Sequence, residues 1–234
     1  MTLLKKYDTL KGDTAKIRYD LKQIFMKGSF AMKIRLTCLA GVILALTLTG
    51  CSENNEKDYS EADLPYGATM LTDTESGNVP ITYDRRFFSP EEAKVLSDYF
   101  YALETKDEKL LDDTTLDLYT DFVTASLYQN MLGMDGLVLD MSDNFAAEEG
   151  ADYVIEEVEI KSFYTSDDQE SSDLANLYNM LAELSGEENY ISSHIQDGKC
   201  IKYTIRTNTN DTIKTFEDQV LFLIKADGVY TICS

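Results

Sequence analysis

Apolar side chains recur three and four positions apart after residue 89, the spacing of an amphipathic helix. The segment opens with Ser89-Pro90-Glu91-Glu92. This serine can accept hydrogen bonds from free helical N–H groups, proline suits the first helical position, and the second glutamate completes a capping box. We therefore predict that a helix begins at Pro90. Its buried face is expected to carry Leu96, Tyr99, Phe100 and Leu103.

Further helices are predicted between residues 105 and 150. A polar break at residues 105–107 ends the first helix, and Asp107 can cap a short second one. Residues 116–131 return to helical spacing, and one more short helix is expected around Phe145. The residues expected to point inward from the 116–131 segment are Tyr119, Phe122, Val123 and Leu127.

From residue 153 to 164 the apolar spacing changes to every second position, which predicts a half-buried strand with Val158 and Ile160 facing inward. A helix is expected next, and Gly186 is placed to end it. Its apolar face comprises Leu174, Leu177, Tyr178, Leu181 and Leu184.

The remaining residues predict an antiparallel meander with strands over 190–195, 199–207, 212–225 and 229–233. The expected connections are Asp197-Gly198, residues 208–211 and Asp227-Gly228. Both Asp-Gly pairs suit two-residue hairpin turns.

The residues before the first helix are polar or irregular. Residues 51–64 lack periodicity and cannot bury enough apolar surface to order themselves, so we expect a flexible tether. In residues 65–88 the alternation of Val79, Ile81 and Tyr83 predicts a short strand, which Pro80 should confine to a sheet edge. We interpret 65–88 as an extended arm on a single domain of residues 89–234.

Helices first, then a strand, a helix and a meander predict an α+β fold with N-terminal helices packed on a curved, mainly antiparallel sheet. This order resembles the nuclear transport factor 2-like, or cystatin-like, cone fold. The resemblance covers residues 89–234 and includes the segments DYFYALETKD at 98–107 and KADGVYTI at 225–232. It implies a sheet wrapped around the first helix, and a pocket between them in which some members use an Asp or a His-Asp pair as general base.

A different pattern lies upstream. The basic start at residues 32–35 precedes an apolar run over 36–48, and the run ends in Leu48-Thr49-Gly50-Cys51. This layout is that of an export signal, and the last four residues resemble a bacterial lipobox. The resemblance implies a diacylglycerol on Cys51 and loss of residues 1–50. The apolar run is too short to span a bilayer, and an ordinary cleaved signal is the alternative.

A lipid on Cys51 would hold the protein on the outer face of the cytoplasmic membrane, because two acyl chains give stable anchoring. The chain also resembles exported lipoproteins that carry cone domains. Met1, Met26 and Met32 are the alternative translation starts, and Met32 gives the most compact signal.

Charge restricts the partners. The chain has 21 Lys and Arg and 42 Asp and Glu, of which 9 and 3 lie in residues 1–50, leaving a formal charge of −27 after cleavage. Such a field repels polyanions, so nucleic acid and anionic headgroups are poor partners. No segment matches the spacing of a calcium-binding loop.

Candidate chemistry centres on His194, the one histidine. If Asp197-Gly198 forms a two-residue turn, His194 lies opposite Ile201, on the face shared by Tyr203 and Ile205. These four residues are the candidate pocket. The alternatives for His194 are a hydrogen-bonded histidine near the core and a general base.

Other chemistry is poorly supported. The predicted strands place Cys200 and Cys233 on either side of a third strand, about 9 to 10 Å apart, which favours buried unpaired thiols over a disulfide. One histidine and two such thiols offer no zinc quartet. There is no phosphate-binding loop or nucleophile elbow, so no metal, other cofactor or catalytic residue is predicted.

The strand over 212–225 is apolar on both faces. Phe216, Val220, Phe222 and Ile224 are expected on one face, and Leu221 and Leu223 on the other. A turn at Asp227-Gly228 would set Leu223 opposite Ile232 and Phe222 opposite Cys233. Because helices are expected on the concave side only, either the 65–88 arm or a second copy should cover the other face. We expect a homodimer through the sheet.

The sequence predicts a membrane-tethered, non-enzymatic lipoprotein that binds a small ligand or another envelope protein. The alternative is a cone-fold enzyme of the isomerase or dehydratase type that uses His194 as general base.

Overall fold

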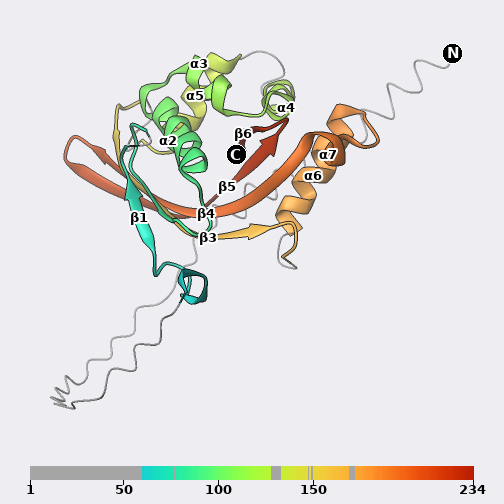
Figure 1. The fold of residues 1–234 in the computed structure, drawn as a ribbon. Helices are drawn as coiled ribbons and strands as arrows, with labels where there is room; N and C mark the ends of the chain where they lie inside the picture. Colours follow the sequence, from blue (N-terminus) through green and yellow to red (C-terminus); the bar gives the residue numbers. More distant parts are fainter. Residues whose placement is uncertain (1–59, 76, 128–132, 147, 149, 169–171) are drawn as a thin grey trace, which may run out of the picture. The chain divides into compact units, whose positions relative to one another are not determined.

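The computed structural model describes residues 60–75, 77–127, 133–146, 148, 150–168 and 172–234 (Figure 1). The chain divides into two compact units, residues 1–63 and 64–234. In the first, the described residues form one 3-10 turn, η1 (Glu61–Asp63). The predicted signal, Cys51 and most of the tether lie outside the described residues.

The second unit contains a six-stranded mixed sheet in the order β1-β2-β3-β4-β5-β6. Only the β2–β3 pair is parallel; the other neighbours are antiparallel. The strands are β1 (Met70–Asp73), β2 (Ile81–Asp84), β3 (Val154–Thr165), β4 (Ile195–Thr209), β5 (Thr212–Ala226) and β6 (Val229–Cys233). With the helices below, this arrangement confirms the predicted α+β class. Figure 1 shows the long strands β4 and β5 as strongly curved.

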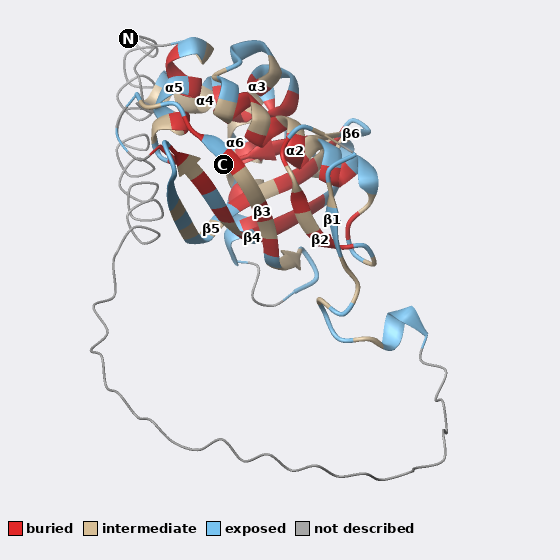
Figure 2. Cartoon of the chain, turned by 90° about the vertical axis from the view of Figure 1, so that its left-hand side faces the viewer, coloured by how far each residue is buried: buried red, intermediate tan, exposed pale blue. Residues whose placement is uncertain are grey.

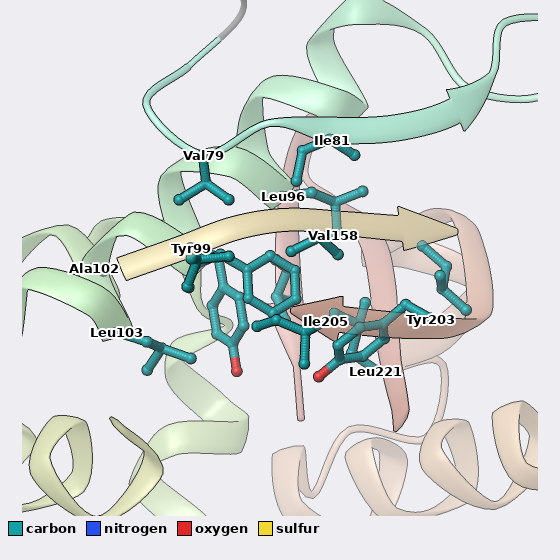
Figure 3. Close-up of a cluster of buried hydrophobic side chains, with 14 of the residues drawn as sticks. Val79, Ile81, Leu96, Tyr99, Ala102, Leu103, Val158, Tyr203, Ile205 and Leu221 are labelled. Atoms are coloured by element: carbon teal, nitrogen blue, oxygen red, sulfur yellow. The ribbon is translucent and has the colours of Figure 1, made fainter. Parts of the chain in front are cut away.

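The helix α2 (Pro90–Thr105) fills the hollow of this sheet. Ser89 is its N-cap, and the predicted capping box with Glu92 is present. The four residues of the predicted stripe are at most 2% exposed. They pack against strand residues such as Ile81, Val158, Tyr203 and Leu221 (Figure 3), and buried positions gather between α2 and the sheet (Figure 2).

The described residues between α2 and β3 form three further helices. They are α3 (Glu108–Thr114), α4 (Asp117–Leu127) and α5 (Met134–Asp143). Asp107 caps α3 as predicted, because its carboxylate accepts from the Leu110 N–H at 3.0 Å. Phe145 is buried just after α5 rather than inside it. Residues 128–131 of the segment predicted as helical lie outside the description.

The helix α6 (Ser172–Ser185) covers the other face of the sheet, together with α4. The expectation that helices cover the concave side alone is therefore wrong. This second core consists of Leu116, Tyr119, Leu174, Leu177, Leu181, Cys200, Ile224, Ala226 and Cys233, with Phe222 packed against it. We expected a second copy because one apolar face of the sheet lacked a cover. Among the described residues α6 and α4 supply that cover, so this reason no longer holds. Farther along that face, Arg206, Thr215 and Glu217 are exposed and polar.

A bulge also changes the predicted faces of β5. Tyr203 pairs with Gln219, but Ile205 pairs with Phe216, so β5 carries one extra residue there. Asp218, within the bulge, has a φ of 55°. Phe216 therefore turns to the α2 side, where its ring meets Phe145 edge-on at 5.7 Å.

The predicted strand over 190–195 is wrong, because Tyr190–His194 forms the short helix α7. The predicted turn at Asp197-Gly198 is wrong as well, since both residues lie within β4. The glycine serves a packing purpose: a Cβ at Gly198 would lie 2.1 Å from the Tyr178 hydroxyl oxygen. The pair Asp227-Gly228 does form a hairpin turn, with φ of 49° and 85°, and it sets Leu223 opposite Ile232 as predicted.

Residues 65–88 contribute β1 and β2 to the sheet. The edge position predicted for the short strand is wrong, because β2 lies between β1 and β3. Pro80 immediately precedes β2, where its missing N–H is not needed, and its carbonyl accepts from the Val158 N–H at 3.0 Å. Ile81 and Tyr83 are at most 1% exposed, so this segment is part of the main core.

Candidate functional site

The structure does not bring the four residues of the candidate pocket together. Ile201, Tyr203 and Ile205 are at most 4% exposed and belong to the core beneath α2. His194 ends α7, and 35% of its side chain is exposed. Ile201 lies six residues beyond the start of β4, which corresponds to about 20 Å along a strand.

His194 is instead held by two carboxylates. Its Nδ1 lies 3.0 Å from Asp227 Oδ1, and its Nε2 lies 3.5 Å from Glu187 Oε2. The ring stacks on Tyr190 with the centroids 5.0 Å apart. The hydrogen bond with Asp227, followed by the charges of Asp227 and Glu187, raises the pKa of His194. Through its contact with Asp227, His194 connects α7 to the β5–β6 turn.

A pocket of about 430 Å³ opens at the junction of α6, α7 and the start of β4. The helices contribute Tyr178 and Ala182 from α6 and Ile191 and Ser192 from α7. The remaining lining residues are Ser166, Glu188, Asn189, Ile195, Gln196, Asp197 and Gly198. Asp197 and Glu188 supply carboxylates, and no lysine or arginine occurs among these described residues.

Tyr178 lies against the backbone of β4 at Gly198, and both residues line the pocket. The missing side chain of Gly198 leaves room for the phenol. Burial, then the charge of Asp197, raises the pKa of Tyr178 to about 12, so the hydroxyl stays protonated at neutral pH and can donate. Asp197 Oδ1 accepts from the Gly198 N–H at 2.8 Å. The lining of the pocket therefore holds the Asp197 carboxylate near the Tyr178 hydroxyl.

Sequence reasoning missed this pocket because it assigned Tyr178 to a core stripe and Asp197-Gly198 to a turn. The available signal was local: the polar segment 187–189 and Gln196-Asp197-Gly198 flank the short apolar pair Tyr190-Ile191. The partner of His194 was missed too, since Asp227 is 33 residues away and served only as a turn residue.

Both described cysteines are buried and free. Burial raises the pKa of the Cys200 thiol to about 11 and raises that of Cys233 further. Neither is therefore an activated nucleophile. Within the described ranges, no group of three metal-ligating side chains is close enough to hold an ion, and no helix is both long and apolar enough to cross a bilayer. Comparison of the chain with protein-family models, curated proteins and solved structures found no match.

Proposed function

We propose that the protein is a lipoprotein of the cell envelope, anchored through Cys51 on the outer face of the cytoplasmic membrane, and that it binds a ligand without catalysing a reaction. The anchor is supported by the basic start, the apolar run and Leu48-Thr49-Gly50-Cys51. The polar segment between Cys51 and the second compact unit suits a tether.

One observation carries the binding function: the α6–α7–β4 pocket combines two carboxylates with a protonated tyrosine hydroxyl, and its described lining residues include no lysine or arginine. A ligand with an ammonium or guanidinium group fits this lining, because Asp197 and Glu188 can pair with its charge. Ala182, Ile191 and Ile195 offer apolar contact to the rest of the molecule. A basic side chain of an envelope protein meets the same requirement.

The alternative, an isomerase or dehydratase with His194 as general base, has one supporting observation, the close approach of Asp227. The geometry around His194 is unfavourable for that reaction. Each ring nitrogen faces a carboxylate, and His194 does not line the pocket. A general base needs a free nitrogen within hydrogen-bond reach of a substrate.

We also propose that residues 89–234 form a cystatin-like cone, to which the preceding residues add two strands and the chain itself adds one outer helix. The packing of α2 in the hollow of a curved sheet supports this assignment (Figure 1). The additions are the strands β1 and β2 before α2, with β2 parallel to β3, and α6 on the outer face.

The binding function is tested with equal concentrations of primary amines, guanidines, carboxylates and neutral sugars in a thermal-unfolding assay. An amine or guanidine at 100 times its Kd stabilises the fold by about 2.7 kcal/mol, which raises Tm by about 5–10 °C for a unit of this size. Asp197→Asn should remove the shift, and Glu217→Gln, remote on β5, should keep it. Shifts given only by carboxylates or sugars, or unchanged by Asp197→Asn, contradict the proposal.

A further inference from the structure

Three aromatic rings, two of them exposed, gather where the chain enters the second unit. The Tyr66 ring stacks on Phe87 with centroids 5.6 Å apart, and Phe163 of β3 lies 5.9 Å from Tyr66 and 5.3 Å from Phe87. Tyr66 and Phe87 are 38% and 40% exposed. We call these three residues the tether-side cluster. Contiguous exposed apolar side chains, unlike single ones, mark interaction surfaces.

The cluster is held firmly at the entry point. The Arg86 guanidinium donates to the carbonyls of Leu64 and Pro65, the second at 2.7 Å, and lies 4.8 Å over the Phe87 ring. Its charge is neutralised by Asp84, whose fully buried carboxylate is 2.6 Å away. The first residues of the unit are therefore fixed beside the exposed rings, and the fold holds the rings in place without a partner.

The length of the preceding chain indicates what lies next to these rings. Leu64 follows Cys51 by 13 residues, and such a segment spans at most about 45 Å when fully extended. A bilayer that holds a lipid on Cys51 therefore stays within this distance of the cluster. The β4–β5 hairpin lies far from the cluster. Thr209, at the hairpin, is ten residues along β4 from Lys199, which is about 33 Å along the strand. Lys199 itself lies 5.9 Å from the Phe163 ring.

We propose that the tether-side cluster is a membrane-contact surface, with the rings of Tyr66 and Phe87 resting among the headgroups of the bilayer that carries the Cys51 lipid. The inference rests on the proposed anchoring. A tyrosine ring favours this interfacial region, because one end is apolar and the hydroxyl tolerates water. A phenylalanine ring adds apolar contact with the acyl boundary. Contact here would turn the opposite end of the sheet, with the β4–β5 hairpin, away from the membrane.

Charge selects the kind of bilayer. The chain after Cys51 carries a formal charge of −27, so an anionic surface repels the unit as a whole. Because Asp84 neutralises Arg86, the cluster offers apolar contact rather than a cationic patch. We expect contact with zwitterionic headgroups and a loss of contact as anionic lipid is added at low salt.

The chain contains no tryptophan, so single substitutions create specific fluorescent reporters. The lipidated full-length protein is reconstituted into zwitterionic vesicles with or without brominated acyl chains, and vesicle flotation is measured in parallel. The reporters are Phe87→Trp and Tyr66→Trp. The matched control is Ile213→Trp, because Ile213 is 56% exposed at the start of β5. Thermal unfolding checks that each variant folds.

The expected result is blue-shifted, bromine-quenched emission from both cluster reporters and unquenched emission from the control. Flotation with all three reporters unquenched overturns the membrane contact but leaves the anchor standing, and the rings then serve a protein partner or a second copy. Equal quenching of all three overturns it too, because the unit then has no preferred contact. Failure to float overturns the anchor, and the membrane contact with it.

Discussion

The ion pair between Lys199 and Glu92 should contribute strongly to stability. The Lys199 ammonium contacts the Glu92 carboxylate, donates to the Phe87 carbonyl at 2.7 Å and lies 4.7 Å above the Phe88 ring. The side chains of the two ions are 11% and 4% exposed. Glu92 also completes the capping box of α2. The pair therefore joins the start of the central helix to β4.

Lys199→Met keeps most of the volume and leaves Glu92 buried without its cation. Removing one member of a buried pair costs about 3–5 kcal/mol, which lowers Tm by about 10 °C for a unit of this size. Differential scanning calorimetry measures the change. In a double-mutant cycle, the variant with both Glu92→Gln and Lys199→Met should lose much less free energy of unfolding than the sum of the losses in the two single variants.

The control for this cycle is the exposed pair Lys94–Asp98 in the same helix, where the lysine side chain is 58% exposed. Lys94→Met should cost no more than about 0.5 kcal/mol. If Lys199→Met lowers Tm no more than Lys94→Met does, or if the cycle shows no coupling, the assignment of the buried pair as a stabilising link is refuted.

Two other predictions concern the α6–α7 region. Gly198→Ala should lower the free energy of unfolding by about 1–3 kcal/mol, because the new Cβ meets Tyr178. Tyr178→Ala in the same chain should relieve part of the clash. An equal Tm for Gly198→Ala and wild type would contradict the contact. The raised pKa of His194 means that its ion pair with Asp227 stabilises fully below the unfolded value of about 6.5 and is lost as pH rises through the folded pKa. The Tm difference between wild type and Asp227→Asn, which tolerates the φ of 49°, should therefore be largest at about pH 5, where a carboxylate is ionised and a histidine is protonated. It should shrink as the pH rises above neutrality, and a pH-independent difference would contradict the pairing.

Features set by a few neighbouring residues could be predicted from the sequence. The helix start at Ser89 and the hairpin at Asp227-Gly228 depend on local hydrogen bonds and backbone angles, and both are present. Gly198 could not be interpreted in this way, because its role is set by Tyr178, which comes from a helix earlier in the chain. Glycine therefore occurs for two different physical reasons in this chain: backbone conformation at Gly228 and close packing at Gly198.

The candidate site depended more on contacts distant in sequence, and it was predicted poorly. Placing His194 on a strand put it beside Ile201, whereas one turn of helix at 190–194 carries it to Asp227. The bulge at Asp218 had a similar effect, since one extra residue reverses the faces of β5 beyond it. Periodicity assumes an uninterrupted strand and cannot reveal such an insertion.

Lipid anchoring at Cys51 is tested most directly by comparing Cys51→Ser with Cys38→Ser. Both variants lose one thiol, but Cys38 lies within the predicted signal and is not expected to carry lipid. Membranes are washed with high salt and partitioned into detergent, and the N-terminal peptide is weighed by mass spectrometry. Wild type and Cys38→Ser should enter the detergent phase with a diacylglycerol mass on Cys51, whereas Cys51→Ser should be uncleaved or released and should not enter it. A Cys51→Ser protein that still enters the detergent phase would contradict the account.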